Sequence, residues 1–314
     1  MTDDLPVRSA ITAQEEVASE QLVQKKEVHT EPKLNRSPLH GLWALTNRDL
    51  VKWYKNPIQL FISLIQPVVW LGLFGKALNF GSFISSSPGI TPAEVATLNL
   101  TTFGTTNYFN FLGAGMLAFI ILFTAAFAGM SVVWDRRFGF MNKALSTPVG
   151  RGAIVTGKVL QSVVRSIVQA AIVLGIAVAL GMDTASFSVF TVAGAFVILF
   201  LMSFGLSSLF VMLALRSSDW QTQMAVINLL NLPLLFASNA MLPVSIMPTW
   251  LKSVVRFNPV SYANDGVRQL LLGSGSVSNY SVLAPLWMDF GVLVAFAALL
   301  SVLGILLSWR LLSK

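Results

Sequence analysis

YFNFLGAGMLAFIILFTAAFAGMSVV, residues 108–133, runs for 26 residues without a charged side chain. It lies inside a longer uncharged gap of 40 residues between Glu94 and Asp135. An α-helix needs roughly 20 apolar residues to cross a hydrocarbon core of about 30 Å. The stretch is therefore predicted to be a transmembrane helix.

The other charged residues of the chain are also few and clustered. Only 11% of the 314 residues are charged, whereas about a quarter is usual in soluble domains. The mean hydropathy is +0.70. Further uncharged gaps of 20, 32, 32 and 20 residues follow Lys55, Asp183, Asp219 and Asp289. Each gap is long enough to hold one membrane span.

A sixth apolar stretch, 159–182, is interrupted by Gln161, Arg165 and Gln169. We expect Arg165 to lie near the start of this span, where its long side chain reaches the headgroups. The sequence thus predicts an all-α integral membrane protein with six transmembrane helices. Their predicted positions are 57–78, 108–133, 159–182, 187–215, 221–243 and 286–311.

Three regions are predicted along the chain. Residues 1–37 are polar and of mixed charge, which indicates a disordered cytoplasmic tail with no secretory signal peptide. Residues 38–56 are predicted to form an interfacial amphipathic helix, and residues 57–314 the six-helix permease domain. The apolar face of the interfacial helix is expected to carry Leu39, Leu42, Trp43, Leu50 and Trp53.

The distribution of Lys and Arg predicts the orientation. Basic residues precede the first predicted span, follow the second and fourth, and end the chain, so both termini are expected in the cytoplasm. Residues 244–285 are expected outside, although they contain Lys252, Arg256 and Arg268. They resemble two short amphipathic helices broken at Asn258-Pro259, either re-entrant or on the extracellular surface.

The sequence lacks common motifs for nucleotide binding, zinc binding and nucleophilic catalysis. It has no GxxxxGK[ST] phosphate loop, no HExxH zinc helix and no GxSxG elbow. It has no cysteine, and both histidines precede the first predicted span. We therefore expect no catalytic, cofactor-binding or metal-binding residue on this chain. Nucleic acid is not an expected partner, because the positive-inside rule explains the net charge of +7.

The loop after the second predicted span reads WDRRFGFMNKALSTPVGRGAIVTGKVL, residues 134–160. Residues 135–148 are predicted to form a short amphipathic helix parallel to the membrane, with Phe138, Met141 and Leu145 on one side. Such a helix suits docking of a soluble partner. A basic loop that only fixes the topology is the alternative.

The loop resembles the cytoplasmic signature of type-2 ABC exporter permeases. The matching residues are Asp135, Arg136, Gly139, Leu145, Thr147, Pro148, Arg151, Gly157 and Lys158. The stretch NPVSYANDGVRQLL, residues 258–271, is similar to a second segment of that family. The family often has Glu in place of Asp135, and its usual acidic residue after the glycine is missing from Phe140-Met141-Asn142.

The resemblance implies a subunit of the cell membrane that pairs with a second permease copy and binds two ABC ATPase subunits. ATP and Mg would then be held by the ATPase, and the 135–148 helix would insert into a groove on it. Members of this family export drugs, lipid-linked glycans and polysaccharides. The implied function is export of a hydrophobic or amphipathic substrate.

Two groups of site residues are predicted. The ATPase-coupling group has Arg136 and Arg137 to pair with ATPase carboxylates, and Phe138 and Met141 to fill an apolar groove; in full it is Asp135, Arg136, Arg137, Phe138, Gly139, Met141, Leu145 and Pro148. The conduit group is polar and lies within two predicted spans: Gln59, Gln66, Asn228, Asn231 and Asn239. Polar groups in lipid face protein or water, so simple interhelical hydrogen bonding is the alternative for the second group.

Two other functions remain open at this point. An ion-coupled carrier would act without an ATPase, but usually requires a carboxylate or histidine relay within the membrane. Asp289, at the start of the last predicted span, is the only carboxylate close to a span. A membrane-embedded assembly factor or enzyme would require a polar catalytic cluster, which the sequence does not display.

Overall fold

The computed structural model describes residues 38–77, 91–105, 107–147, 150–217, 219–273 and 283–311. The predicted tail, 1–37, and Pro148 lie outside these residues. The described part is helical, with no strand. Its elements are α2 (Pro38–Tyr54), α3 (Pro57–Trp70), the π-helical η1 (Leu71–Ala77), α5 (Pro92–Phe103), α6 (Tyr108–Arg137), α7 (Phe140–Leu145), α8 (Arg151–Ala179), α9 (Val189–Ala214), α10 (Trp220–Phe236), the 3₁₀ turn η2 (Val244–Ile246), α11 (Thr249–Val255), α12 (Pro259–Leu271) and α13 (Leu286–Leu311).

Every predicted span corresponds to a helix. Four of these helices, α6, α8, α9 and α13, are long and apolar enough to cross a bilayer. The first predicted span divides into α3 and η1, and the fifth is the 17-residue α10, which ends at Phe236. The all-α membrane fold is thus confirmed, while the count of six spans stays a prediction.

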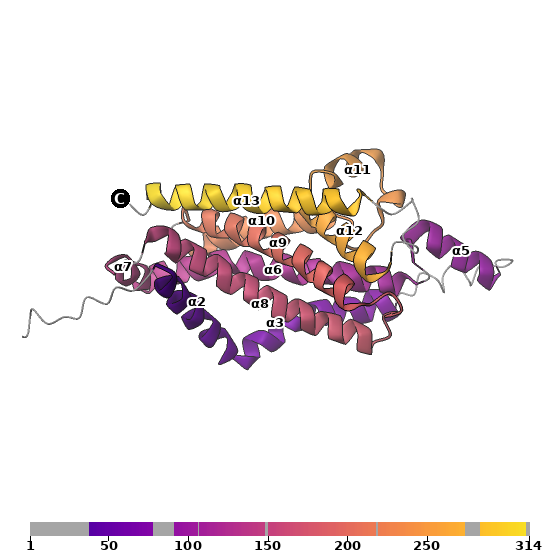
Figure 1. The fold of residues 1–314 in the computed structure, drawn as a ribbon, viewed down its shortest axis with the longest axis horizontal. Helices are drawn as coiled ribbons and strands as arrows, with labels where there is room; N and C mark the ends of the chain where they lie inside the picture. The colour runs from indigo at the N-terminus through magenta and orange to yellow at the C-terminus, as the bar shows by residue number, and fades with distance from the viewer. Residues whose placement is uncertain are drawn as a thin grey trace, which may run out of the picture. The chain divides into compact units, whose positions relative to one another are not determined.

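The stretch 108–133 forms the centre of the bundle. It belongs to α6, of which 24 of 30 residues are buried. In the apolar windows of the spanning helices, 83% of the residues are buried for the segment containing α6, compared with 22% for α13. Both windows are apolar, so the difference shows that α6 contacts protein and α13 leaves much of its surface for lipid. Figure 1 shows α6 behind α8 and α9, with α13 along the edge of the bundle.

The ends of the bundle carry different connections. In Figure 1, α7 and the C-terminal end of α13 lie at one end, whereas α5 and α11 lie toward the other. We call the first the α7 end and the second the α5 end. The basic loop between α6 and α8 thus lies at the same end of the bundle as the C-terminal end of α13. The sequence predicts both of them on the same side of the membrane.

Glycines let neighbouring helices approach α6 closely. A Cβ at Gly129 would lie 2.5 Å from the carbonyl oxygen of Phe210 on α9. A Cβ at Gly115 would lie 2.2 Å from the carbonyl oxygen of Ala240. Small residues of α6 thus allow close packing against it.

Three local predictions need correction. Helix α8 begins at Arg151, eight residues before the predicted start, so Arg165 is the middle residue of the 29-residue helix and not near its beginning. Helix α7 has only six residues, fewer than the predicted 135–148, because α6 itself continues to Arg137. Helix α5 was not predicted, although Thr91 and Glu94 form a capping box around Pro92.

The packing of α6 against α9 gives the first testable expectation. Gly129→Ala is expected to destabilise the protein by about 1–3 kcal/mol, because the new methyl group pushes against backbone that cannot move aside. The measurement is thermal unfolding of the detergent-solubilised permease. Gly175→Ala on α8 is the matched control, since a Cβ there meets nothing within 4 Å. Equal stability of the two variants would contradict the close α6–α9 contact.

Candidate functional site

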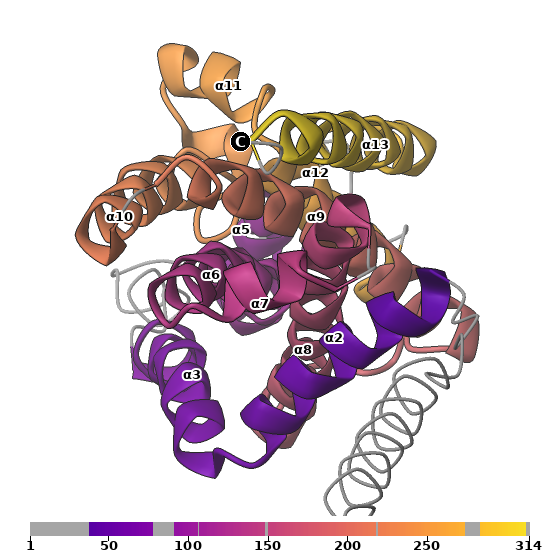
Figure 2. The same cartoon turned by 90° about the vertical axis from the view of Figure 1, so that its left-hand side faces the viewer.

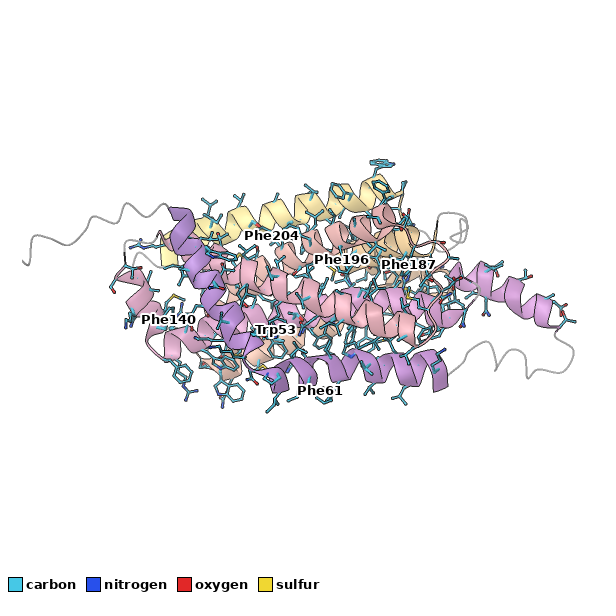
Figure 3. The ribbon with its side chains drawn as sticks, turned by 60° about the horizontal axis from the view of Figure 1, so that its bottom comes forward. Trp53, Phe61, Phe140, Phe187, Phe196 and Phe204 are labelled. Atoms are coloured by element: carbon cyan, nitrogen blue, oxygen red, sulfur yellow. The ribbon has the colours of Figure 1, made fainter. Side chains whose placement is uncertain are left out.

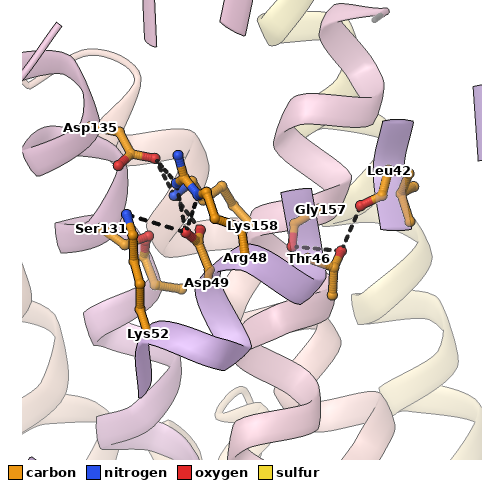
Figure 4. A network of polar contacts seen from close by, with 10 residues as sticks. Leu42, Thr46, Arg48, Asp49, Lys52, Ser131, Asp135, Gly157 and Lys158 are labelled. Atoms are coloured by element: carbon orange, nitrogen blue, oxygen red, sulfur yellow. Dashed lines mark hydrogen bonds and ion pairs between the residues drawn. The ribbon is translucent and has the colours of Figure 1, made fainter. Parts of the chain in front are cut away.

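Helix α2 lies across α8 at the α7 end of the bundle. The hydroxyl of Thr46 is fully buried and donates to the carbonyl oxygens of Leu42 at 2.9 Å and Gly157 at 3.4 Å. Gly157 presents no side chain, so the backbone of α2 comes close to α8. Figure 4 shows Thr46 between Leu42 and Gly157.

Four charged side chains meet beside this contact, and we call them the ion cluster: Arg48, Asp49, Asp135 and Lys158. The Arg48 guanidinium lies 2.6 Å from Asp49 and 2.8 Å from Asp135. The Lys158 ammonium is 2.5 Å from Asp49 and also pairs with Asp135. The cluster therefore joins α2, α6 and α8 with balanced charge (Figure 4).

The ion cluster is shielded from solvent. Lys158, Asp49 and Asp135 expose only 7%, 10% and 13% of their side chains. Burial opposes ionisation of Asp49, but Lys158 and Arg48 outweigh it and lower the pKa of this carboxyl below 3.8. Removing one member of such a cluster leaves an uncompensated buried charge.

Helix α7 packs against the ion cluster through Phe140. The guanidinium of Arg48 lies 3.4 Å from the centre of the Phe140 ring, a cation–π contact between α2 and α7. Met141 and Ala144 of α7 are buried against residues of α6, α8 and α9. Figure 3 shows Phe140 at the α7 end of the bundle.

The turn between α6 and α7 projects away from the protein. Phe138 exposes 80% of its side chain, and Arg137 is also exposed. Gly139 follows with φ +72°, a left-handed conformation that glycine adopts without strain. On α7, Lys143 is exposed in the same part of the chain. An exposed aromatic ring and two exposed cations are thus presented at the α7 end.

Arg136 points the other way, toward the chain that follows α9. Its guanidinium donates to the carbonyl oxygens of Leu215 and Ser217, each at 3.0 Å. These carbonyls lie just after the last turn of α9, where a cation is favourable. Arg136 thereby ties the end of α6 to the connection between α9 and α10.

The structure divides the predicted coupling group. Arg137, Phe138 and Gly139 lie in the projecting turn, as a docking surface requires. Asp135 belongs to the ion cluster, and Arg136 is engaged with carbonyl oxygens, so the predicted pairing of Arg136 with a partner's carboxylate does not fit this geometry. Met141 exposes only 4% of its side chain and packs inside the protein, so it cannot fill a partner's groove. Leu145 is half-buried in the same core.

The predicted conduit group does not converge within one chain. Gln66 on α3 lines a pocket between α3, α6 and α8. Asn228 is exposed on α10, whereas Asn231 and Asn239 are buried and have side-chain atoms without a hydrogen-bond partner. Figure 2 shows α3 and α10 on opposite sides of α6. Gln59 belongs to α3, and its side chain lies outside the described residues.

The second motif, residues 258–271, corresponds to α12 and its N-cap residue, Asn258. The side chain of Asn258 donates to the carbonyl oxygens of Leu234 and Ala237 at the end of α10, at 2.8 and 2.7 Å. Arg268 is 4% exposed and donates to three carbonyl oxygens, those of Phe111, Asn239 and Ala240. Two short helices, α11 and α12, meet near Asn258, and α12 is buried between α6, α9 and α13 rather than on the surface.

The residues that pair with Asp135 and Lys158 in the ion cluster were not predicted from the sequence. Asp135 and Lys158 were noticed as motif residues, but Arg48 and Asp49 were assigned only to the interfacial helix. The sequence feature that could have indicated these partners is a single acidic residue, Asp49, among the basic residues Arg48, Lys52 and Lys55. The residues of the predicted apolar face of α2 also differ in burial, because Trp53 is buried while Trp43 exposes 58% of its side chain.

The ion cluster yields a prediction for stability. Lys158→Gln is expected to destabilise the protein by about 3–5 kcal/mol, because it leaves two buried carboxylates with one cation. Asp49→Asn in the same chain should recover part of this loss, so the two effects will not add. Unfolding of the detergent-solubilised single and double variants measures the coupling. Lys143→Gln, an exposed lysine of α7, is the control; a loss equal to that of Lys158→Gln would argue against the cluster.

The lowered pKa of Asp49 predicts how stability responds to acid. A carboxyl whose pKa is lowered in the folded state stabilises the protein at any pH above its ordinary pKa of 3.8. This stabilisation is lost as the pH falls through the folded-state pKa. The stability difference between wild type and Asp49→Asn is therefore expected to be constant above about pH 5 and to shrink below pH 4. A difference that grows on acidification would contradict the assignment. Unfolding measured between pH 3 and 7 tests this.

Comparisons with known proteins agree with both motifs. The sequence profile of a family described as "ABC-2 type transporter" matches residues 40–272. A protein of Porphyra purpurea whose name describes a transport permease, ycf38, is 29% identical over 264 residues, which cover 83% of this chain and 84% of that protein. The corresponding ycf38 protein of Cyanophora paradoxa is 30% identical over 233 residues, 74% of each chain. The daunorubicin resistance ABC transporter permease protein DrrB1 of Streptomyces coeruleorubidus is 24% identical over 261 residues, 83% of each chain.

Proposed function

Because the chain belongs to the ABC-2 type transporter family, and is therefore a membrane permease subunit of an ABC transporter, we propose that it exports a hydrophobic or amphipathic substrate with energy from a separate ATPase. The family implies an ABC ATPase as partner, and this subunit binds no ATP in the proposal. ATP and Mg belong to the ATPase, two copies of which serve a pair of permeases.

The observation that carries the proposal is the projecting turn at the α7 end. Arg137 and Phe138 are exposed there, whereas Asp135 is held by the ion cluster, Arg136 by the carbonyl oxygens after α9, and Met141 by the core under α7. An exposed aromatic ring next to an exposed arginine is a composition typical of interface hot spots. The proposed ATPase therefore contacts Arg137 and Phe138, with the ring in an apolar groove and the cation beside a carboxylate.

The basic residues support a cytoplasmic position for the α7 end. Arg137, Lys143, Arg151 and Arg216 all lie in its short connections, and the described part of the connection between α5 and α6 has neither Lys nor Arg. The positive-inside rule then places both termini in the cytoplasm. The plasma membrane is the proposed location of the chain.

A second permease copy is part of the proposal. The outer face of α3 and η1 is apolar along its whole length, with Ile58, Phe61, Ile65, Val69 and Leu73 each more than 40% exposed. Phe61 is seen on this outer face in Figure 3. Such a face is covered either by lipid or by a second permease, and in the proposal a conduit forms where two copies of the chain meet.

The docking surface can be tested by charge reversal and truncation. Arg137→Glu together with Phe138→Ala is expected to lower copurification of the ATPase at least tenfold, because both groups of the proposed hot spot are lost. Arg256 and Phe257 form the same exposed dipeptide near the α5 end, with Phe257 89% exposed. Arg256→Glu with Phe257→Ala is therefore the matched control and should leave copurification unchanged.

Other outcomes would overturn the proposal. Equal copurification by both double variants would exclude the projecting turn as the contact. Solute movement by the purified chain in liposomes without any ATPase would favour the ion-coupled carrier instead.

A further inference from the structure

A pocket of about 280 Å³ lies between α3, α6 and α8. Its apolar wall is formed by Ile120, Phe123, Phe127 and Trp134, which succeed one another along α6. Phe127 and Trp134 are 42% and 47% exposed, so the wall continues to the outer surface of the bundle. Figure 2 shows α3, α6 and α8 from the α7 end, with α2 crossing in front of α8.

Arg165 lines the same pocket from α8. It forms no ion pair among the described residues, and its Nε is buried without a hydrogen-bond partner. The guanidinium carbon lies 6.0 Å from the centre of the Trp53 ring, a long cation–π contact. A cation inside an apolar pocket is costly unless an anion or water compensates it.

The acidic residues closest along the helices cannot serve Arg165. Asp49 and Asp135 are already paired with Arg48 and Lys158 in the ion cluster. Lys158 precedes Arg165 by seven residues on α8, which places Arg165 about 10 Å further from the α7 end at 1.5 Å per residue. The guanidinium is therefore available to a ligand that enters the pocket.

The polar side of the pocket is held in place by hydrogen bonds. Gln169 is fully buried and joins three helices: Thr124 of α6 donates to its oxygen at 2.6 Å, and its nitrogen donates to Ser63 of α3 at 2.5 Å. Gln66, one turn further on α3, also lines the pocket. The pocket thus has a built polar side and an apolar side, and a charge that neither side neutralises.

We propose that this pocket binds an amphiphile of the cytoplasmic leaflet with a net negative charge, carried by a phosphate or a carboxylate without a neighbouring cationic group, on an apolar chain. The guanidinium of Arg165 offers paired N–H donors that match either group. The apolar chain lies along Phe123, Phe127 and Trp134. The inference rests on the proposed function, because it assigns the substrate class of the exporter and the place where substrate leaves the bilayer.

Trp134 provides a direct readout of ligand binding. The probes are phosphatidylglycerol and phosphatidylcholine with brominated acyl chains, added to the full-length permease in detergent micelles. The share of fluorescence that disappears in Trp134→Phe belongs to Trp134. Brominated phosphatidylglycerol is expected to quench this share at about tenfold lower mole fraction than brominated phosphatidylcholine, the factor expected from one charge-assisted pair.

Three substitutions decide whether the preference comes from Arg165. Arg165→Gln is expected to make the two lipids equally effective, and Arg165→Lys to retain part of the difference because the charge remains. Arg256→Gln, which removes the same charge near the α5 end, should retain all of it. Should Arg165→Gln not fold, the wild-type comparison of the two lipids and Arg165→Lys still test the proposal.

Several results would overturn the inference. Equal quenching by both lipids in the wild type would do so, as would a preference for phosphatidylglycerol that persists in Arg165→Gln. Since the chain has no cysteine, Gln66→Cys introduces a unique thiol. A disulfide between two copies through this thiol would show the pocket to be filled by a second permease instead. The quenching needs no ATPase, so a failure of ATPase copurification is distinguishable from a failure of lipid binding.

Discussion

The mutual neutralisation of Arg48, Asp49, Asp135 and Lys158 is the interaction on which the α7 end depends. Removing any one of these side chains would leave an uncompensated charge that is largely shielded from solvent. Their distances of 2.5–2.8 Å require α2, α6 and α8 to keep fixed relative positions. Because Arg48 also lies against Phe140, the position of α7 follows from the same four charges.

At the α5 end, a buried cation is stabilised by backbone carbonyl oxygens instead of by carboxylates. Arg268 has no ion pair among the described residues; its guanidinium donates to the carbonyl oxygens of Asn239 and Ala240, just after α10, and of Phe111 on α6. Gly115 makes room for this arrangement, since a Cβ there would be 2.9 Å from the guanidinium. Burial lowers the pKa of Arg268 to about 9, with opposing contributions from Asp265 and Tyr108. Backbone carbonyl oxygens thus stabilise the buried charge of α12.

The sequence predicts the helices well because lipid imposes a simple rule on them. Uncharged gaps locate α6, α9 and α13 to within a few residues, since in these helices an unpaired charge would face lipid or a packed core. The rule fails at α8, where Lys158 was taken as the end of a loop. Lys158 lies inside the helix because Asp49 and Asp135 neutralise it, and these partners are 109 and 23 residues away in sequence. Pairing over such distances leaves no periodic pattern in a single sequence.

The candidate site was only partly predictable for the same reason. Residue type and spacing identified the loop after α6, and Arg137 and Phe138 are indeed exposed. Whether a neighbour in that loop faces inward is decided by tertiary contacts, as with Met141 in the core and Arg136 on the carbonyls after α9. Likewise, Trp43 and Trp53 appear equivalent in sequence, but only Trp53 is covered, because the face of α2 that packs on α8 is the one that carries Thr46 and Asp49.

The contrast between the exposed Phe138 and its inward-facing neighbours determines how force would pass from an ATPase to the spans in the proposed mechanism. A push on Phe138 acts on a turn whose two ends are both fixed: α6 through Asp135 and Arg136, and α7 through Phe140 and Met141. The ion cluster and the Arg136 contacts link that turn to α2, α8 and the connection between α9 and α10. The turn therefore cannot move alone, since any displacement either carries these helices with it or separates buried charges. In the proposal the pocket at Arg165 lies on the same α8, two helical turns beyond Lys158, so the movement that couples to the ATPase reaches the ligand through one rigid helix.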